Sequence, residues 1–148
     1  MGNAKKVSEQ LVTLQLGDLT TRSISDNLLY LQALLLMGLA NSSSGPIQAQ
    51  QSSWINLALS VSTFLKLYSH NPHEHVVGSD IDTNENVGRR AWLVLVVMDR
   101  WNAAGTRLPL LIADGQAKMY RGDGVLLGNI GFQFARRCLL PSLSNLLY

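Results

Sequence analysis

Apolar residues recur along most of the chain at three- and four-residue spacings, the pattern of α-helices with one buried face. A short helix is expected over residues 7–16, because Gly17 follows as a typical helix end. A second helix is expected over residues 27–40. It is apolar almost all round, which is typical of a central helix that is buried on most sides. Ser25 and Asp26 precede it as an N-cap and a first-turn carboxylate.

A third helix is expected over residues 47–68. Trp54, Ala58, Val61 and Leu65 follow one another there at spacings of four, three and four residues. These spacings place the four side chains on one face of a helix, while polar residues fill much of the remaining surface. We therefore expect this face to pack against the second helix.

The fourth segment is a continuous apolar run with charged residues at both ends. Its β-branched interior, residues 94–97, is also compatible with a buried strand. The pattern continues beyond the length of a typical strand, and this favours a helix over residues 86–104. The residues that flank the run are Arg89 and Arg90 on one side and Asp99, Arg100 and Trp101 on the other.

Charged groups at the ends of a buried helix need partners, because a charge that is removed from water without one is costly. We expect Asp99 to bond to a backbone or basic group on a neighbouring segment. Arg100 occupies the next position and is not expected to face Asp99, so its partner should lie elsewhere. A catalytic role for Asp99 is disfavoured, because no nucleophile or second acid stands at a useful spacing.

The last helix is expected over residues 125–140, and Pro141 ends it. Residues 69–86 have the composition of a surface loop. No convincing pair of strands is present. The sequence predicts an all-α fold, a bundle of four to five helices in a single domain over residues 1–148 with its core in residues 25–114. We expect this bundle to be part of a larger helical domain.

Composition narrows the possible classes of protein. Hydrophobic residues make up 47% of the chain and charged residues 15%, which excludes a disordered chain. The net charge of +2 is too small to indicate nucleic-acid binding. The longest apolar stretches are shorter than the roughly 20 residues that span a bilayer, so we expect a soluble protein without membrane contact. A single cysteine, Cys138, excludes an intramolecular disulfide.

Candidate chemistry is sparse. His70, His73 and His75, with Asp80 and Asp82 close behind, form the only metal-like cluster. Proline and glycine within this loop favour a solvated loop over a metal site of fixed geometry. The glycines of residues 122–131 lack the preceding strand and the Lys-Ser/Thr pair of a phosphate loop. We therefore expect no catalytic residue, metal or cofactor.

A combination of residues in the middle of the chain resembles the regulatory middle homology region of fungal zinc binuclear cluster transcription factors. The matching positions are Trp54, Arg89, Arg90, Trp92, Asp99, Arg100 and Pro109. The resemblance covers residues 28–114 and is greatest to the members that regulate sugar transport or carbon-source genes. The chain departs from the family pattern at Leu93, where a second tryptophan is usual, and before Pro109, where a Gly-Arg pair is usual.

The resemblance implies a non-enzymatic, all-helical regulatory domain that acts in the nucleus. Its partners would be other parts of the same factor or a corepressor, a small-molecule effector, or a second copy in a homodimer. The cysteine-rich DNA-binding module of the family is missing from this chain, so direct contact with nucleic acid is not expected. Trp54, Trp92 and Trp101 are the candidate lining of a pocket between the helices, which the sequence itself does not show. The alternatives are a helical protein-interaction module unrelated to transcription and a small helical protein that binds an apolar ligand or acts as an enzyme.

Overall fold

The computed structural model describes residues 19–42, 48–69 and 82–139 of the 148-residue chain. In these ranges the chain forms α-helices and one 3-10 turn, and no strand, so the predicted all-α class is confirmed. The elements are α2 (Ile24–Ser42), α3 (Gln48–Phe64), η2 (Leu67–Ser69), α4 (Asn84–Thr106) and α5 (Asp123–Leu139). The predicted helix of residues 7–16 and most of the predicted loop of residues 69–86 lie outside the described residues.

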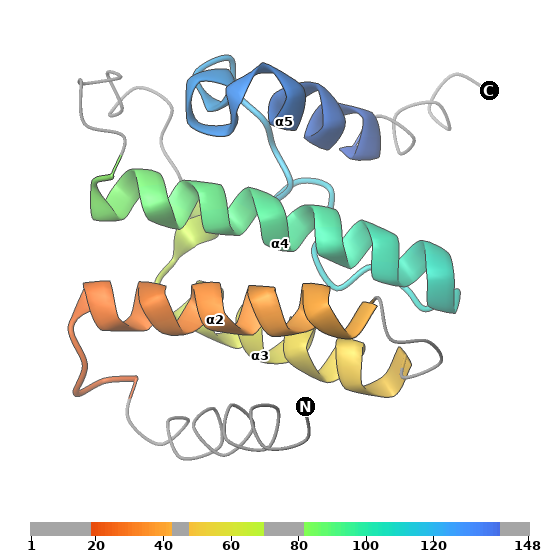
Figure 1. Cartoon of the computed structure of the whole chain (residues 1–148), viewed down its shortest axis with the longest axis horizontal. Coiled ribbons are helices and arrows are strands. Elements are labelled where there is room, and N and C mark those ends of the chain that lie inside the picture. The colour runs from red at the N-terminus through yellow and green to blue at the C-terminus, as the bar shows by residue number, and fades with distance from the viewer. Residues whose placement is uncertain (1–18, 43–47, 70–81, 140–148) are drawn as a thin grey trace.

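Helix α4 is the central element of the bundle (Figure 1). Helices α2 and α3 run antiparallel beside each other, and both pack against one side of α4. Helix α5 packs against the opposite side of α4 and runs in the same direction as α4. The β-branched run that was compatible with a strand therefore lies in a helix, as its length predicted.

The hydrophobic core lies where α2, α3 and α4 meet. Its side chains include Leu31 and Leu34 of α2, Ile55 and Val61 of α3, and Trp92, Leu95 and Val96 of α4, all nearly inaccessible to solvent. The predicted packing of α3 against α2 is confirmed, and Trp54, Ala58 and Val61 are buried as expected. The helix ends at Phe64 and not at residue 68, so Leu65, the fourth predicted position, lies beyond it and is partly buried against the core. Burial of each large aliphatic side chain stabilises the fold by about 1.5–3 kcal/mol.

Helix starts follow local capping chemistry. The Ser23 hydroxyl accepts a hydrogen bond from the Asp26 backbone N–H at 3.1 Å and donates one to Asp26 Oδ2 at 2.7 Å. The N-cap of α2 is thus Ser23, the residue just before the helix begins at Ile24. The prediction of Ser25 was wrong, because Ser23 lies three residues before Asp26, the spacing at which a capping side chain reaches a backbone N–H of the first turn. Thr83 similarly caps α4 by accepting from the Asn86 N–H at 3.2 Å.

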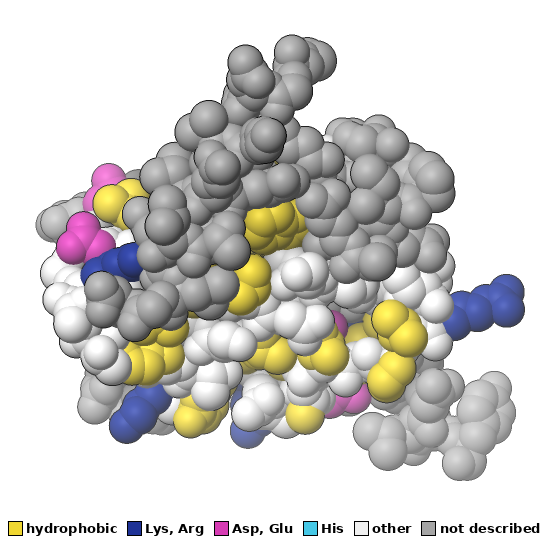
Figure 2. Space-filling model, turned by 90° about the horizontal axis from the view of Figure 1, so that it is seen from below, with side chains coloured by type: hydrophobic (Ala, Val, Ile, Leu, Met, Phe, Trp, Pro, Cys, Tyr) yellow, Lys and Arg dark blue, Asp and Glu magenta, His cyan; other side chains and the backbone are white. Residues whose placement is uncertain are grey.

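Helix α2 is less enclosed than its sequence indicates. Leu29 and Leu36 are 64% and 66% exposed, and Ala33 and Ala40 on the same face are also exposed. The prediction of burial on most sides was therefore wrong. Among the described elements, α2 packs closely against α3 and α4, and these two neighbours cover only part of its circumference. On the face over α2 and α3, hydrophobic side chains reach the surface among polar ones (Figure 2).

Helix α5 contains a break at Gly128, whose φ of 68° and ψ of 167° are not helical. Such a backbone conformation is open essentially to glycine alone. The predicted last helix, residues 125–140, is confirmed as an element, but it begins at Asp123 and is kinked. In the described residues, no helix combines the length and the apolar character needed to cross a bilayer.

Candidate functional site

After α4 the chain reverses and runs back along the same helix as residues 107–122, called here the return segment (Figure 1). Arg107 makes the reversal in a left-handed conformation with φ of 58°, and its backbone N–H donates to the Ala103 carbonyl at 2.8 Å. The return segment leads to the start of α5. Because it has no regular structure across most of its length, its buried backbone groups need partners outside the segment's own secondary structure.

Asp99 supplies the first of these partners. Its side chain is fully buried, and its carboxylate accepts hydrogen bonds from two successive backbone N–H groups. Oδ1 lies 3.1 Å from the nitrogen of Leu111, and Oδ2 lies 3.0 Å from the nitrogen of Ile112, which is itself fully buried. The prediction that Asp99 bonds to a backbone or basic group of a neighbouring segment is confirmed.

Arg100 holds the same turn from a second direction. Nη1 donates to the Ile112 carbonyl at 3.0 Å, and Nη2 donates to Asp114 Oδ1 at 2.8 Å. These partners lie elsewhere in the chain, as expected. The expectation that Arg100 does not face Asp99 was wrong, because Nη1 also lies 3.5 Å from Asp99 Oδ2. The flexible arginine side chain brings its head group to the segment that Asp99 binds, although the two residues leave the helix on different sides.

Arg89 fixes the other end of the return segment. Its Nε and Nη2 atoms each donate to one carboxylate oxygen of Asp123 at 2.8 Å, and both side chains are 2% exposed. Nη2 also donates to the Lys118 carbonyl at 2.8 Å. The guanidinium lies 5.2 Å from the centre of the Tyr120 ring. Asp123 in turn accepts from the Tyr120 backbone N–H at 2.7 Å, so this buried pair joins α4, the return segment and α5.

Sequence reasoning missed the role of Asp123. An acidic residue at the start of a helix is common for electrostatic reasons, so its presence alone was not informative. A stronger signal was available in the buried-looking Arg89, which requires an acidic partner somewhere in the chain. Which acid serves could not be read from the sequence, because the two residues are 34 positions apart.

The remaining signature residues are dispersed. Arg90 pairs with Asp82 at 3.1 Å on the surface, and Pro109 is an exposed residue of the return segment. Trp54 and Trp92 are buried in the core, and neither indole nitrogen has a hydrogen-bond partner. The structure therefore brings together Arg89, Asp99 and Arg100 around the return segment. We refer to these three as the clamp residues.

The clamp residues are arranged to hold structure in place. Both carboxylate oxygens of Asp99 and both of Asp123 are engaged by backbone or guanidinium donors. A general base would need a free oxygen that faces a substrate, and these groups do not offer one. Within the described ranges no three histidine, cysteine, aspartate or glutamate residues gather as a metal site. The predicted histidine loop falls outside those ranges, apart from Asp82.

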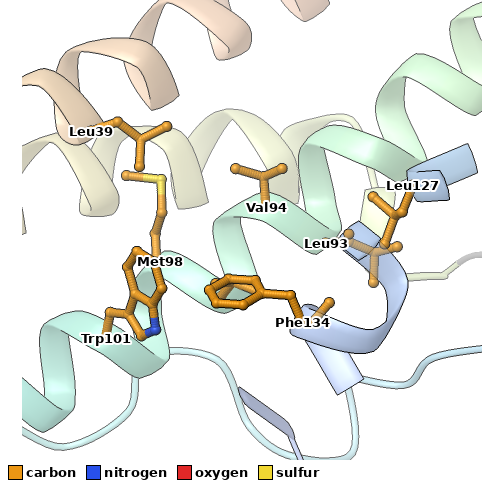
Figure 3. Close-up of a pocket in the computed structure, with 10 residues that line it drawn as sticks. Leu39, Leu93, Val94, Met98, Trp101, Leu127 and Phe134 are labelled. Carbon is orange, nitrogen blue, oxygen red and sulfur yellow. The ribbon is translucent and has the colours of Figure 1, made fainter. Parts of the chain in front are cut away.

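A separate apolar cavity of about 200 Å³ lies between the end of α2, residues 93–101 of α4, and α5. Its walls include Leu39, Val94, Met98, Trp101, Leu127 and Phe134 (Figure 3). Trp101 is 49% exposed, and its ring meets that of Phe134 edge-to-face with 5.3 Å between the centroids. Of the three tryptophans considered for a pocket, Trp101 lines this cavity, whereas Trp54 and Trp92 do not.

Comparison with known proteins gives one informative match. No protein-family model matches the chain, and no solved structure matches it significantly. An uncharacterized transcriptional regulatory protein of the fission yeast Schizosaccharomyces pombe is 29% identical over 127 residues. The match covers 80% of the chain but only 14% of that relative's length. The chain is thus similar to a small part of a fungal transcriptional regulatory protein.

Proposed function

We propose that this chain is a non-enzymatic regulatory region of a fungal transcription factor and acts in the nucleus. The observation that carries the proposal is the 29% identity with a fission yeast transcriptional regulatory protein over most of the chain. The resemblance of Trp54, the clamp residues and Pro109 to the middle homology region of zinc binuclear cluster factors supports the same assignment. The fully engaged carboxylates of Asp99 and Asp123 support a structural role for the charged residues.

Such a region would control transcription through contacts with other proteins. The chain has a net charge of only +2, so contact with DNA would be made by a separate module. The exposed leucines of α2 offer an apolar surface for other parts of the factor, a corepressor or a second copy of the chain. The resemblance to carbon-source regulators suggests that growth on different sugars is the condition under which control is exerted.

A tethered reporter assay tests this function. The full chain is fused to a heterologous DNA-binding module in yeast, and reporter output is compared with that of the module alone on several carbon sources. We expect the fusion to change the output, and the change to be lost in Asp99→Ala, which releases the return segment. Asp114→Ala, at an exposed side chain of the same network, serves as the control and should retain the effect. Equal output from the fusion and the module on every carbon source would contradict the proposal.

The exposed face of α2 also favours a second candidate, a helical interaction module unrelated to transcription. The same reporter assay separates the two functions. An unrelated interaction module would leave the output unchanged, yet substitution of Leu29 and Leu36 by glutamine would still abolish its binding to a partner.

A further inference from the structure

We propose that the cavity between α2, α4 and α5 binds a small apolar molecule built on an aromatic ring, of the size of benzene or indole. None of the clamp residues lines this cavity. Its walls come from three helices, so a molecule bound there would contact the end of α2, residues 93–101 of α4, and α5 at once (Figure 3).

The size of the cavity limits the ligand. Its volume is about 200 Å³. An apolar cavity of about 150 Å³ in an engineered protein is large enough to hold benzene. A single aromatic ring or a small fused ring therefore fits within the cavity, whereas a steroid, a nucleotide or a long acyl chain would extend beyond it.

The walls determine the chemistry. The side chains that line the cavity are aliphatic or aromatic, apart from the thioether of Met98. A sugar would lose hydrogen bonds with water on entering and would find almost none in return, at about 1–3 kcal/mol for each unpaired hydroxyl. A monosaccharide is therefore excluded as the ligand of this cavity, even though the sequence resembles regulators of carbon-source genes.

The aromatic walls favour a ring over a saturated ligand of the same size. Trp101 and Phe134 already meet edge-to-face, and their rings lie together at one side of the cavity (Figure 3). A third ring can add offset or edge contacts to both, and such contacts contribute beyond simple burial of area. The sulfur of Met98, on the Trp101 side, can also contact the ring of a ligand favourably.

The cavity is formed by close approach of the helices as well as by side-chain size. Gly38 of α2 packs against Met98 of α4, and a Cβ atom added at position 38 would lie 2.5 Å from the Met98 methyl carbon. This contact sets the position of Met98 next to Leu39 at the rim. A role for the bound ring as an effector rests on the regulatory function proposed above, whereas binding itself does not.

Binding is tested on the purified full chain without any reporter, so that this inference and the proposed function fail separately. Indole is titrated and followed by saturation-transfer NMR and by the thermal shift of the protein, with glucose as the comparison ligand. We expect saturable binding of indole, a rise in Tm, and intermolecular NOEs to the methyl groups of Met98 and Leu39. Glucose should give none of these signals.

Two variants that fill the cavity locate the site. Ala135→Leu adds volume to a buried wall, and Leu39→Phe adds volume from the half-exposed rim. Each should weaken indole binding by about tenfold or more. Leu36→Phe, an equivalent change on the exposed face of the same helix, is the matched control and should bind as the wild type does. If Ala135→Leu fails to fold, Leu39→Phe still tests whether indole binds in this cavity, because residue 39 is partly exposed and tolerates a larger side chain.

Three results would overturn the inference: no saturable binding of indole by the wild-type chain, equal binding by the wild type and Leu39→Phe, or binding of glucose with the same NOEs. The first denies that a ligand enters. The second places binding elsewhere on the molecule, and the third denies the selectivity argued from the walls.

Discussion

Asp99 is a buried carboxylate with no exposed surface, yet both of its oxygens have donors. The donors are the successive backbone N–H groups of Leu111 and Ile112 in the return segment. Without Asp99, the N–H group of the fully buried Ile112 would have no hydrogen-bond partner. Arg100 adds a positive charge 3.5 Å from Asp99 Oδ2 and binds the carbonyl of the same residue. One turn of irregular chain is thus held on both its donor and its acceptor sides.

The first prediction concerns Asp99. Asp99→Ala should lower the free energy of unfolding by about 3–5 kcal/mol, because it strands two backbone donors and removes a counter-charge from Arg100. The corresponding fall in Tm is roughly 6–20 °C. Urea titration followed by circular dichroism measures the change. Asp114→Ala, whose carboxylate is largely exposed, should cost less than about 1 kcal/mol. Equal Tm values for wild type and Asp99→Ala would refute the structural role.

The second prediction concerns two glycines whose Cβ positions are open. A Cβ at Gly128 or at Gly105 would meet nothing within 4 Å, so only the backbone distinguishes the sites. Gly128→Ala should destabilise the chain by about 1–3 kcal/mol, because φ is 68° there. Gly105→Ala, inside α4, should stabilise it by about 0.5–1 kcal/mol. Thermal unfolding of both variants tests this, and a change of the same sign in both would be inconsistent with the kink.

At the scale of elements, α4 organises the molecule because it has partners on two opposite sides. Trp92, Leu95 and Val96 belong to the core that α4 shares with α2 and α3. On the other side, Trp101 contacts Phe134 of α5, and the clamp residues hold the return segment and the start of α5. The Arg89–Asp123 pair is a polar link between α4 and α5 that is bidentate and nearly inaccessible to solvent. A bidentate geometry compensates for desolvation better than a single contact does.

The third prediction is a double-mutant cycle on this pair. Arg89→Met and Asp123→Ala should each cost about 3–5 kcal/mol, because each leaves a buried charge without its partner. The double variant should cost less than the sum, with a coupling energy of about 1–3 kcal/mol by denaturant titration. The surface pair Arg90–Asp82 is the control, and its coupling should be below about 1 kcal/mol. Additive effects at Arg89 and Asp123 would show that the pair is not a unit.

The fourth prediction contrasts two neighbouring leucines of α2. Leu35 is 5% exposed and Leu36 is 66% exposed. Leu35→Ala should cost about 2–5 kcal/mol through the cavity that it leaves. Leu36→Ala should change the free energy of unfolding by less than about 1 kcal/mol. Chemical denaturation of the two variants tests the orientation of α2 directly, and a large loss in Leu36→Ala would mean that this face is covered.

At the scale of the whole molecule, the described helices form three layers, and α4 is the middle layer. The α2–α3 pair forms one layer, α4 the next and α5 the last (Figure 1). Parallel neighbours such as α4 and α5 need a connection that returns the full length of a helix. The return segment is that connection, which explains why the clamp residues lie toward opposite ends of α4.

The fifth prediction concerns stability at alkaline pH. Burial raises the pKa of Tyr30 above its ordinary value of 10.0, and the nearby Arg22 only partly opposes this. The folded state thus favours the neutral phenol. Its contribution to stability is complete below pH 10 and is lost as the pH rises through the raised pKa. Denaturant titrations across this range should show a steeper loss for the wild type than for Tyr30→Phe. Identical pH profiles would indicate that Tyr30 ionises freely.

The sequence by itself determined that the segments of α2, α3, α4 and α5 are helical and that Asp99 needs a partner. Both follow from local physics: apolar periodicity sets helix length, and a charge in an apolar run cannot stay unpaired. Only the tertiary structure decided that the partners of Asp99 are the Leu111 and Ile112 amides, that Asp123 pairs with Arg89, and that α2 leaves Leu36 exposed. The cavity beside Trp101 is also a feature that only the tertiary structure decided. These features depend on how helices distant in the chain meet, which periodicity within one helix does not specify.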